Sequence, residues 1–92
     1  MQNALIMEPV DDVAVVTCAV ESGGTIAYLL GGKKQEVVAT QEIPRYHKVA
    51  VRRITQGEVV RKYGTIIGEA TQDIAAGSHV HTHNIDSTAK KE

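Results

Sequence analysis

The sequence predicts a small all-β domain built from short strands and tight turns. Short apolar runs rich in β-branched residues alternate with glycine-containing turns. No window carries the apolar i, i+3, i+4, i+7 stripe of an amphipathic helix. A chain of 92 residues has the length of one domain. We expect that domain to span residues 1–85 and a polar tail to follow over 86–92.

The first half of the chain contains three expected strands. They cover residues 13–20, 25–30 and 35–43, and the last is ended by Pro44. The segments between them, residues 22–24 and 31–34, contain paired glycines and are expected as turns.

A weak internal repeat runs through the second half. An isoleucine is followed three residues later by a turn residue, and three residues further on by valine. The copies begin at Ile43, Ile54 and Ile74, and the turn residue is glycine in two of them and Tyr46 in the first. Glycine supplies the positive φ that such turns often need. Each copy therefore predicts a strand end, a tight turn and a new strand, as in a compact β-structure rather than an α/β sheet.

The composition indicates a thin hydrophobic core. Apolar residues make up 42 % of the chain, but three tyrosines are its only aromatic residues, and large rings normally supply much of a core's buried area. We therefore expect the chain to depend on a partner or to self-associate when isolated. The single cysteine, Cys18, is expected to be a small buried apolar residue in a reducing compartment.

Charge is distributed unevenly. The net charge of −1 argues against a dedicated nucleic-acid-binding protein. Residues 45–62 nevertheless contain six basic residues and one acid, Glu58. This stretch predicts either a solvated basic face or attraction for a small anionic ligand. We expect no signal peptide, no membrane-spanning segment and no membrane partner, and hence a cytoplasmic location.

Three of the four histidines lie within five residues, at positions 79, 81 and 83. In a strand, alternate side chains share a face, so the three imidazoles would project together and Val80 would face the core. Neighbouring imidazoles, about 6.6 Å apart, could converge on one metal ion, whereas the outer pair, about 13 Å apart, could not unless the chain bends sharply. No Cys, Asp or Glu lies among them to complete a metal site. A second candidate is His47-Lys48, for which an ordinary surface pair is the alternative.

Several short motifs occur in order between residues 11 and 84. They are Asp11-Asp12-Val13-Ala14-Val15, His47-Lys48 with Ala50, Gly57, Val60-Arg61-Lys62-Tyr63-Gly64, Ile67-Gly68 with Ala70, Asp73-Ile74-Ala75-Ala76-Gly77 and His79-Val80-His81-Thr82-His83-Asn84. Together they resemble the SAF domain of the altronate and galactarate dehydratase family, with residues 21–42 matching only loosely. Tyr46 departs from the glycine that the family usually has before His-Lys, and Ile66 stands where the dehydratases often have proline.

The resemblance implies a β-clip fold and a role in a hydro-lyase that removes water from sugar acids. Because the chain stops soon after the last motif, it resembles the family's separate small subunits. The implied partners are a large catalytic lyase subunit and a small anionic sugar acid. The nearest rival is the small subunit of a sulfolactate sulfo-lyase. A different class of function is a non-catalytic sugar-acid-binding or regulatory module.

The resemblance also implies abstraction of the α-proton beside a carboxylate, followed by loss of the β-leaving group. Histidine suits the acid or base role because its pKa lies near neutrality. The implied catalytic residues are His79, His81 and His83, of which His81 and His83 would contact substrate or a divalent metal ion (Fe²⁺ or Mn²⁺) shared with the partner. The implied substrate-binding residues are His47, Lys48 and Asn84, with Lys48 facing the carboxylate. Which histidine is base, acid or ligand stays open.

Overall fold

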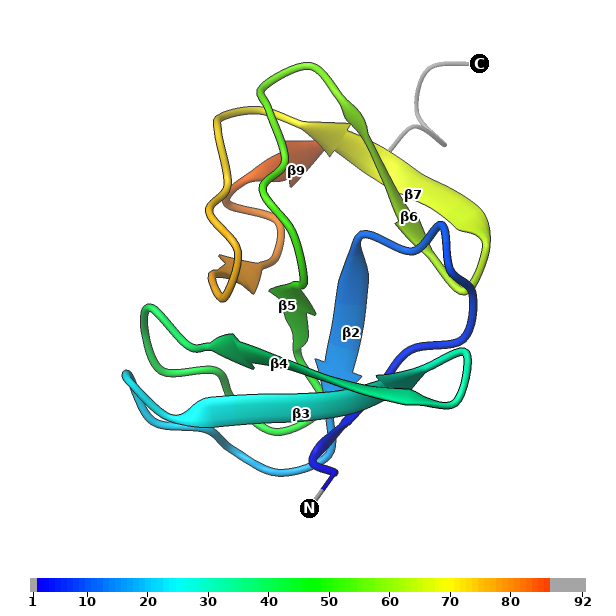
Figure 1. Cartoon of the computed structure of the whole chain (residues 1–92). Coiled ribbons are helices and arrows are strands. Elements are labelled where there is room, and N and C mark those ends of the chain that lie inside the picture. Colours follow the sequence, from blue (N-terminus) through cyan, green and yellow to red (C-terminus); the bar gives the residue numbers. More distant parts are fainter. Residues whose placement is uncertain (1, 87–92) are drawn as a thin grey trace.

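The computed structural model describes residues 2–86, and within them the secondary structure consists entirely of short strands (Figure 1). The all-β prediction is confirmed. The strands are β1 (Ala4–Leu5), β2 (Val13–Val16), β3 (Thr25–Leu30), β4 (Lys33–Val38), β5 (Lys48–Ala50), β6 (Val59–Lys62), β7 (Thr65–Ala70), β8 (His79–Val80) and β9 (Ile85–Asp86).

These strands form three antiparallel sheets. The central sheet has the order β1-β2-β5-β8, the second is the β3-β4 hairpin, and the third has the order β6-β7-β9. Figure 1 shows β2 and β5 running between the β3-β4 hairpin at the bottom and the β6-β7-β9 sheet at the top. The central sheet therefore connects two outer layers that are far apart in the view.

The internal repeat organises the whole fold and has a fourth copy, which begins at Val20. In every copy the carbonyl of the second residue accepts a hydrogen bond from the N–H of the fifth, over 2.8–3.1 Å. The fourth residue has a positive φ, as in a type II turn: the values are 85° at Gly23, 68° at Tyr46, 90° at Gly57 and 89° at Gly77. The Val20 copy does not match the sequence pattern of the repeat, because valine precedes its turn and isoleucine follows it, the reverse of the other three copies.

Each copy buries the two apolar residues that flank its turn, six positions apart. The first two copies contribute to one core cluster and the last two to another; the pairs are Val20 and Ile26, Ile43 and Val49, Ile54 and Val60, and Ile74 and Val80. The copies also join in pairs: Val20 and Ile43 exchange backbone hydrogen bonds of 2.9 and 2.8 Å, and Ile54 and Ile74 exchange two of 2.8 Å. The domain thus has two halves of like construction.

Several strand boundaries differ from the sequence prediction. The strand over 25–30 is confirmed, but β2 ends at Val16 and β4 ends at Val38. Val20 and Ile43, predicted as strand ends, instead bridge each other at the start of their turns. Cys18 lies in the bend after β2 and is exposed, so the expectation that it is buried is wrong. Asp86, assigned to the tail from sequence, is the last residue of β9, and residues 87–92 lie outside the described residues.

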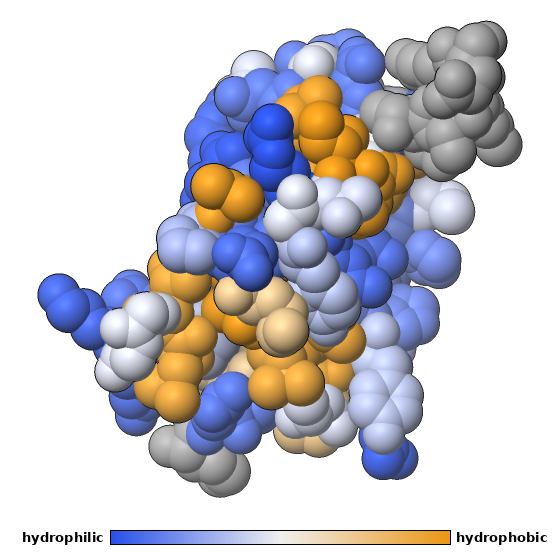
Figure 2. Space-filling model, turned by 90° about the vertical axis from the view of Figure 1, so that its right-hand side faces the viewer, coloured by the Kyte–Doolittle hydropathy of each residue, from blue (hydrophilic) through white to orange (hydrophobic). Residues whose placement is uncertain are grey.

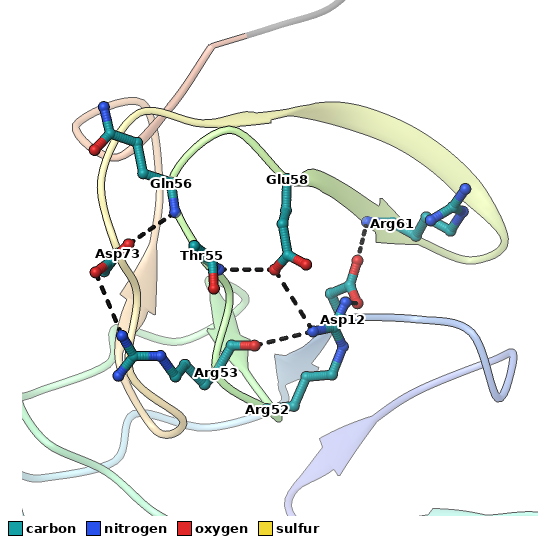
Figure 3. A network of polar contacts seen from close by, with 8 residues as sticks. All are labelled: Asp12, Arg52, Arg53, Thr55, Gln56, Glu58, Arg61 and Asp73. Carbon is teal, nitrogen blue, oxygen red and sulfur yellow. Dashed lines mark hydrogen bonds and ion pairs between the residues drawn. The ribbon is translucent and has the colours of Figure 1, made fainter.

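A buried carboxylate, Asp12, links the central sheet to β6 (Figure 3). Its side chain is 1 % exposed, and its Oδ2 accepts a hydrogen bond of 2.8 Å from the N–H of Arg61. Its Oδ1 forms an ion pair with Arg52, whose guanidinium also lies 3.9 Å from Glu58. Arg53 pairs with Asp73 at 3.4 Å. Two residues of the basic stretch are therefore bound to the chain's own carboxylates and are not free cations for a ligand.

The neighbouring Asp11 fixes the segment before β2. Its carboxylate accepts hydrogen bonds from the N–H groups of Gly64 at 2.7 Å and Glu8 at 3.0 Å. Desolvation alone would raise the pKa of Asp11, but these and other backbone donors outweigh it and lower the pKa below the ordinary value. An ionised Asp11 thus ties the N-terminal segment to the β6-β7 turn.

The surface carries several separate apolar patches. Figure 2 views the side that lies on the right of Figure 1 and shows apolar atoms in patches among polar ones. The large apolar side chains that are exposed over the described residues are Leu5, Met7, Val10, Leu29, Val38, Tyr46, Tyr63 and Ile66.

Gly77 should be far less tolerant of alanine than Gly57, although both have a φ near 90°. A Cβ at Gly57 would meet nothing within 4 Å, whereas at Gly77 it would collide with the backbone carbonyl of Val38. We expect Gly57→Ala to lower the free energy of unfolding by about 1–2 kcal/mol through backbone strain alone. Gly77→Ala should lower it by more than about 3 kcal/mol. Urea unfolding of the two variants measures this, and equal losses would contradict the packing described here.

Candidate functional site

The segment that carries three histidines is a strand for only two residues. β8 ends at Val80, and the chain then turns. Asn84, which is buried, closes this turn: its Oδ1 accepts the N–H of His81 at 3.0 Å and its Nδ2 donates to the carbonyl of His79 at 2.8 Å. The prediction of one extended strand over 79–83 is wrong, because the Asn84 side chain offers the backbone a local alternative to strand pairing.

The turn brings the imidazoles closer together than a straight strand would. The ring centroid of His79 lies 5.6 Å from that of His81 and 5.4 Å from that of His83. A straight strand would place residues 79 and 83 about 13 Å apart. The chain therefore bends sharply after Val80, and this bend brings the His79 ring close to those of both His81 and His83.

His47 completes the group from the neighbouring strand. It precedes β5, which pairs with β8, and its ring centroid lies 5.0 Å from that of His79 and 5.1 Å from that of His81. We call His47, His79, His81 and His83 the histidine cluster. All four histidines of the chain belong to it, so His47 is not an isolated surface residue.

One hydrogen bond inside the cluster couples two imidazoles. Nδ1 of His47 and Nε2 of His79 are 2.8 Å apart. One of these nitrogens must donate and the other accept, so the tautomer of each ring sets that of the other. This bond holds the His79 ring in place and leaves its Nδ1 as the nitrogen not engaged with His47.

Two imidazoles of the cluster, those of His79 and His81, are held toward the neutral form. Desolvation, followed by the proximity of the other three histidines and Lys48, lowers the pKa of His79 to about 4. Desolvation also lowers the pKa of His81, with His47, Lys48 and His83 acting in the same direction. A neutral imidazole can accept a proton or ligate a metal ion. At neutral pH His79 and His81 are thus in the state that a base or ligand needs.

Lys48 and Asn84 frame the cluster. Lys48 is half-buried, pairs in register with Val80, and is close enough for its charge to act on His79 and His81. Burial, and then the charge of Lys62, lowers the pKa of Lys48. The Asn84 side chain hydrogen-bonds to the backbone of His79 and His81 and so fixes the turn that carries them.

The cluster is an open surface rather than an enclosed site. Two shallow pockets of about 120 and 260 Å³ lie elsewhere, and no histidine lines either of them. Within residues 2–86, no group of three or more His, Cys, Asp or Glu side chains is arranged to hold a metal ion. Within the described residues, the cluster offers imidazoles and Lys48, but no carboxylate ligand for a metal ion and no segment that covers it.

The low pKa of His79 predicts a loss of stability in mild acid. In the unfolded chain this histidine takes up a proton near its ordinary pKa of 6.5, whereas the folded chain resists until about 4. Its contribution to stability is therefore complete above pH 6.5 and is lost as the pH falls toward 4. We expect the thermal midpoint to fall between pH 7 and pH 4.5, and to fall less in His79→Asn. Parallel curves for the two proteins would contradict the low pKa.

The chain has relatives among known proteins. Residues 2–88 match the family model described as the altronate/galactarate dehydratase SAF domain. The altronate dehydratase of Escherichia coli K12 is 42 % identical over 74 residues, which are 80 % of this chain and 14 % of that protein. The (2R)-sulfolactate sulfo-lyase subunit alpha of Paracoccus pantotrophus is 44 % identical over 48 residues, which are 52 % of this chain and 72 % of that subunit.

Further relatives give the same two names. The altronate dehydratase of Bacillus subtilis 168 is 46 % identical over 43 residues, 47 % of this chain and 9 % of that protein. The chain thus spans only a small part of the altronate dehydratases that it matches. No helix in the described part of the chain is long and apolar enough to cross a membrane. Because the family model covers nearly the whole sequence, the chain belongs to the SAF domain family of altronate and galactarate dehydratases.

Proposed function

We propose that this chain is the small subunit of a cytoplasmic sugar-acid hydro-lyase of the altronate/galactarate type, and that its histidine cluster forms one wall of an active site completed by a large lyase subunit. The observation that carries the proposal is the cluster itself: four imidazoles gathered on an open face, two of them with a lowered pKa. The subunit names of the sulfo-lyase relatives support a partner chain.

The proposed reaction is an elimination. A base removes the proton next to the substrate's carboxylate, the electron pair forms a double bond, and the β-hydroxyl leaves as water after it receives a proton. A base must be unprotonated at the working pH, a condition that His79 and His81 both meet. His79 would be the candidate base wherever His81 ligates a metal ion. Lys48 would face the carboxylate, where its ammonium group opposes the charge that develops during proton removal.

A divalent metal ion, Fe²⁺ or Mn²⁺, fits this surface only as a shared site. His47 and His79 are hydrogen-bonded to each other. His81 and His83 would therefore be the imidazole ligands, and the partner would supply the remaining metal ligands. Bound there, the ion would stabilise negative charge on the substrate oxygen. The neutral form of His81 at pH 7 suits ligation, which requires an unprotonated nitrogen.

A second candidate is the small subunit of a sulfolactate sulfo-lyase, in which sulfite would leave in place of hydroxide. It is favoured by the match to 72 % of the length of the Paracoccus pantotrophus alpha subunit. Assay of the complex with altronate, galactarate and sulfolactate separates the two, since water loss gives a keto acid and the other reaction releases sulfite. A third reading, a non-catalytic sugar-acid-binding module, requires binding of the acid without turnover.

The isolated chain should have no lyase activity. Its cluster lies on an open surface, and such eliminations need a closed site that excludes water and supplies the remaining acid, base or metal ligands. We expect no turnover of altronate, galactarate or sulfolactate by the pure chain, and turnover after addition of the large lyase subunit. Turnover by the pure chain would contradict the shared site.

Replacement of His81 or His83 by alanine in the complex should cost about 10²- to 10⁴-fold in turnover, the usual range for a lost acid–base group. Assembly should persist, because His81 and His83 are exposed whereas Val80 is buried in a core. Thr82→Ala is the matched control, since Thr82 is exposed in the same turn and has no imidazole. Val80→Asp should instead damage folding, because it buries an unpaired charge.

Near-normal turnover in both histidine variants, with the complex intact, would remove the cluster from catalysis. The binding-module reading would then explain the data better. Added Fe²⁺ or Mn²⁺ should restore part of the activity of these variants if the lost imidazole is a metal ligand, and none if it acts only in proton transfer. Metal content of the purified complexes, measured by elemental analysis, gives the same distinction without an activity assay.

A further inference from the structure

Tyr46 occupies the one repeated turn whose positive-φ residue is not glycine. Its φ is 68°, and the equivalent residues of the other three turns are Gly23, Gly57 and Gly77. A bulky residue with a Cβ rarely adopts this conformation, because the Cβ crowds the following carbonyl. The turn is nevertheless kept, with the N–H of His47 bonded to the carbonyl of Pro44 at 3.0 Å. The backbone at this site is therefore strained.

The Tyr46 side chain makes little contact with the hydrophobic cores, so its packing does not offset this strain. It is 63 % exposed and belongs to neither core cluster. Its ring contacts the preceding residue: the Arg45 guanidinium carbon lies 4.5 Å from the ring centroid, and Arg45 Nη2 donates to the phenol oxygen at 2.7 Å. The two side chains form an ordered pair that projects from the turn. Backbone strain that no packing of the side chain in the core explains suggests a function for the residue.

The position of this pair relates it to the histidine cluster. Tyr46 directly precedes His47, whose ring faces His79 and His81. The Tyr46 ring instead contacts the Arg45 guanidinium. The pair is therefore next to the cluster in sequence but takes part in none of the ring contacts of the cluster, which suits a contact with a subunit that covers the histidines. That placement favours a protein contact over a contact with a small acid held by the imidazoles.

We propose that Tyr46 and Arg45 are a docking anchor for the large lyase subunit, an inference that rests on the proposed function. Tyrosine and arginine are among the residues most enriched at interface hot spots. The contact between the two side chains in the free chain would reduce the rotational freedom lost on association. Arg45 takes part in none of the ion pairs of residues 2–86. The partner surface should therefore present an apolar slot for the ring and a carboxylate for the guanidinium.

The test uses Tyr46→Gly and two measurements on the full chain. Calorimetric titration with the purified large lyase subunit should show affinity at least about tenfold weaker than wild type, as expected for a hot-spot truncation. Thermal unfolding of the free chain should show a midpoint raised by about 4 °C, because glycine relieves the strain. Weaker binding together with higher thermal stability is the result expected of a residue that is kept for binding at a cost to the stability of the fold.

Tyr63→Gly is the matched control. Tyr63 also has a positive φ, 55°, is exposed, and has Lys62 4.9 Å from its ring centroid, but it lies in the β6-β7 turn. Its replacement should relieve the same kind of strain and leave the affinity for the lyase subunit within twofold of wild type. Arg45→Glu should weaken binding, and more so at low salt.

Wild-type affinity in Tyr46→Gly, with the wild-type complex formed, would overturn the anchor and leave the proposed function standing. Equal weakening by Tyr63→Gly would overturn it as well, since the effect would not belong to Tyr46. If the mutation abolishes self-association of the chain but not lyase binding, the anchor serves a second copy and the proposal is wrong. If the wild-type chain does not bind the lyase subunit at all, the proposed function fails together with the anchor.

Discussion

A tight turn with a positive φ at its fourth residue, used four times, is the constraint on which this structure depends. Each turn reverses the chain and places two buried apolar residues six positions apart on the same core. The turns join in pairs through backbone hydrogen bonds. A domain with no Trp or Phe can therefore build two small cores mainly from valine, isoleucine and alanine.

The same turns assemble the candidate site. β5 begins directly after the second turn and β8 directly after the fourth, and these two strands pair in the central sheet. His47 closes one turn and His79 follows the other, so the pairing brings the two rings to hydrogen-bond distance. Asn84 then bends the chain after Val80 and draws His81 and His83 to the same place. The histidine cluster is therefore a consequence of turn geometry. Its central contact joins His47 and His79, which are 32 residues apart in the sequence.

The electrostatics of the cluster follow from this crowding. Four imidazoles and Lys48 share a small surface, and the pKa of His79 is lowered first by desolvation and then by the charges of these neighbours. Elsewhere the fold places its carboxylates against basic groups and backbone donors, as Asp12 with Arg52 and Asp11 with Gly64. The lowered pKa values of His79 and His81 beside Lys48 are the electrostatic features on which the proposed binding of an anionic substrate rests.

The sequence predicts the fold class, the hairpin strand over 25–30, and three of the four repeated turns, because glycine and apolar spacing are local signals. It misplaces the ends of β2 and β4 because Val20 and Ile43 pair with each other across the fold, which no local pattern reveals. Cys18 is misjudged because an apolar run does not show where a strand stops. The bend at His81 is missed because period-two histidines favour a strand, although Asn84 three residues later is a turn former.

The contact between His47 and His79 is likewise beyond local reasoning. The repeat contained a signal for it: aligning the turns at Tyr46 and Gly77 places His47 and Ser78 at equivalent positions, with His79 next in line. The turns themselves pair first with second and third with fourth, so the contact between the second and fourth comes from the pairing of β5 with β8. Side-chain roles within the cluster depend on distances and tautomers that emerge only in three dimensions.

The central claim is that the histidine cluster lies in an active site shared with a large lyase subunit. The most direct test is nuclear magnetic resonance of the chain with ¹³C-labelled histidine, free and in the complex, with and without an inhibitory substrate analogue. The ring signals of His79 and His81 should shift on addition of the analogue only when the large subunit is present. Unchanged ring signals in an analogue-saturated complex would show that the cluster lies outside the site.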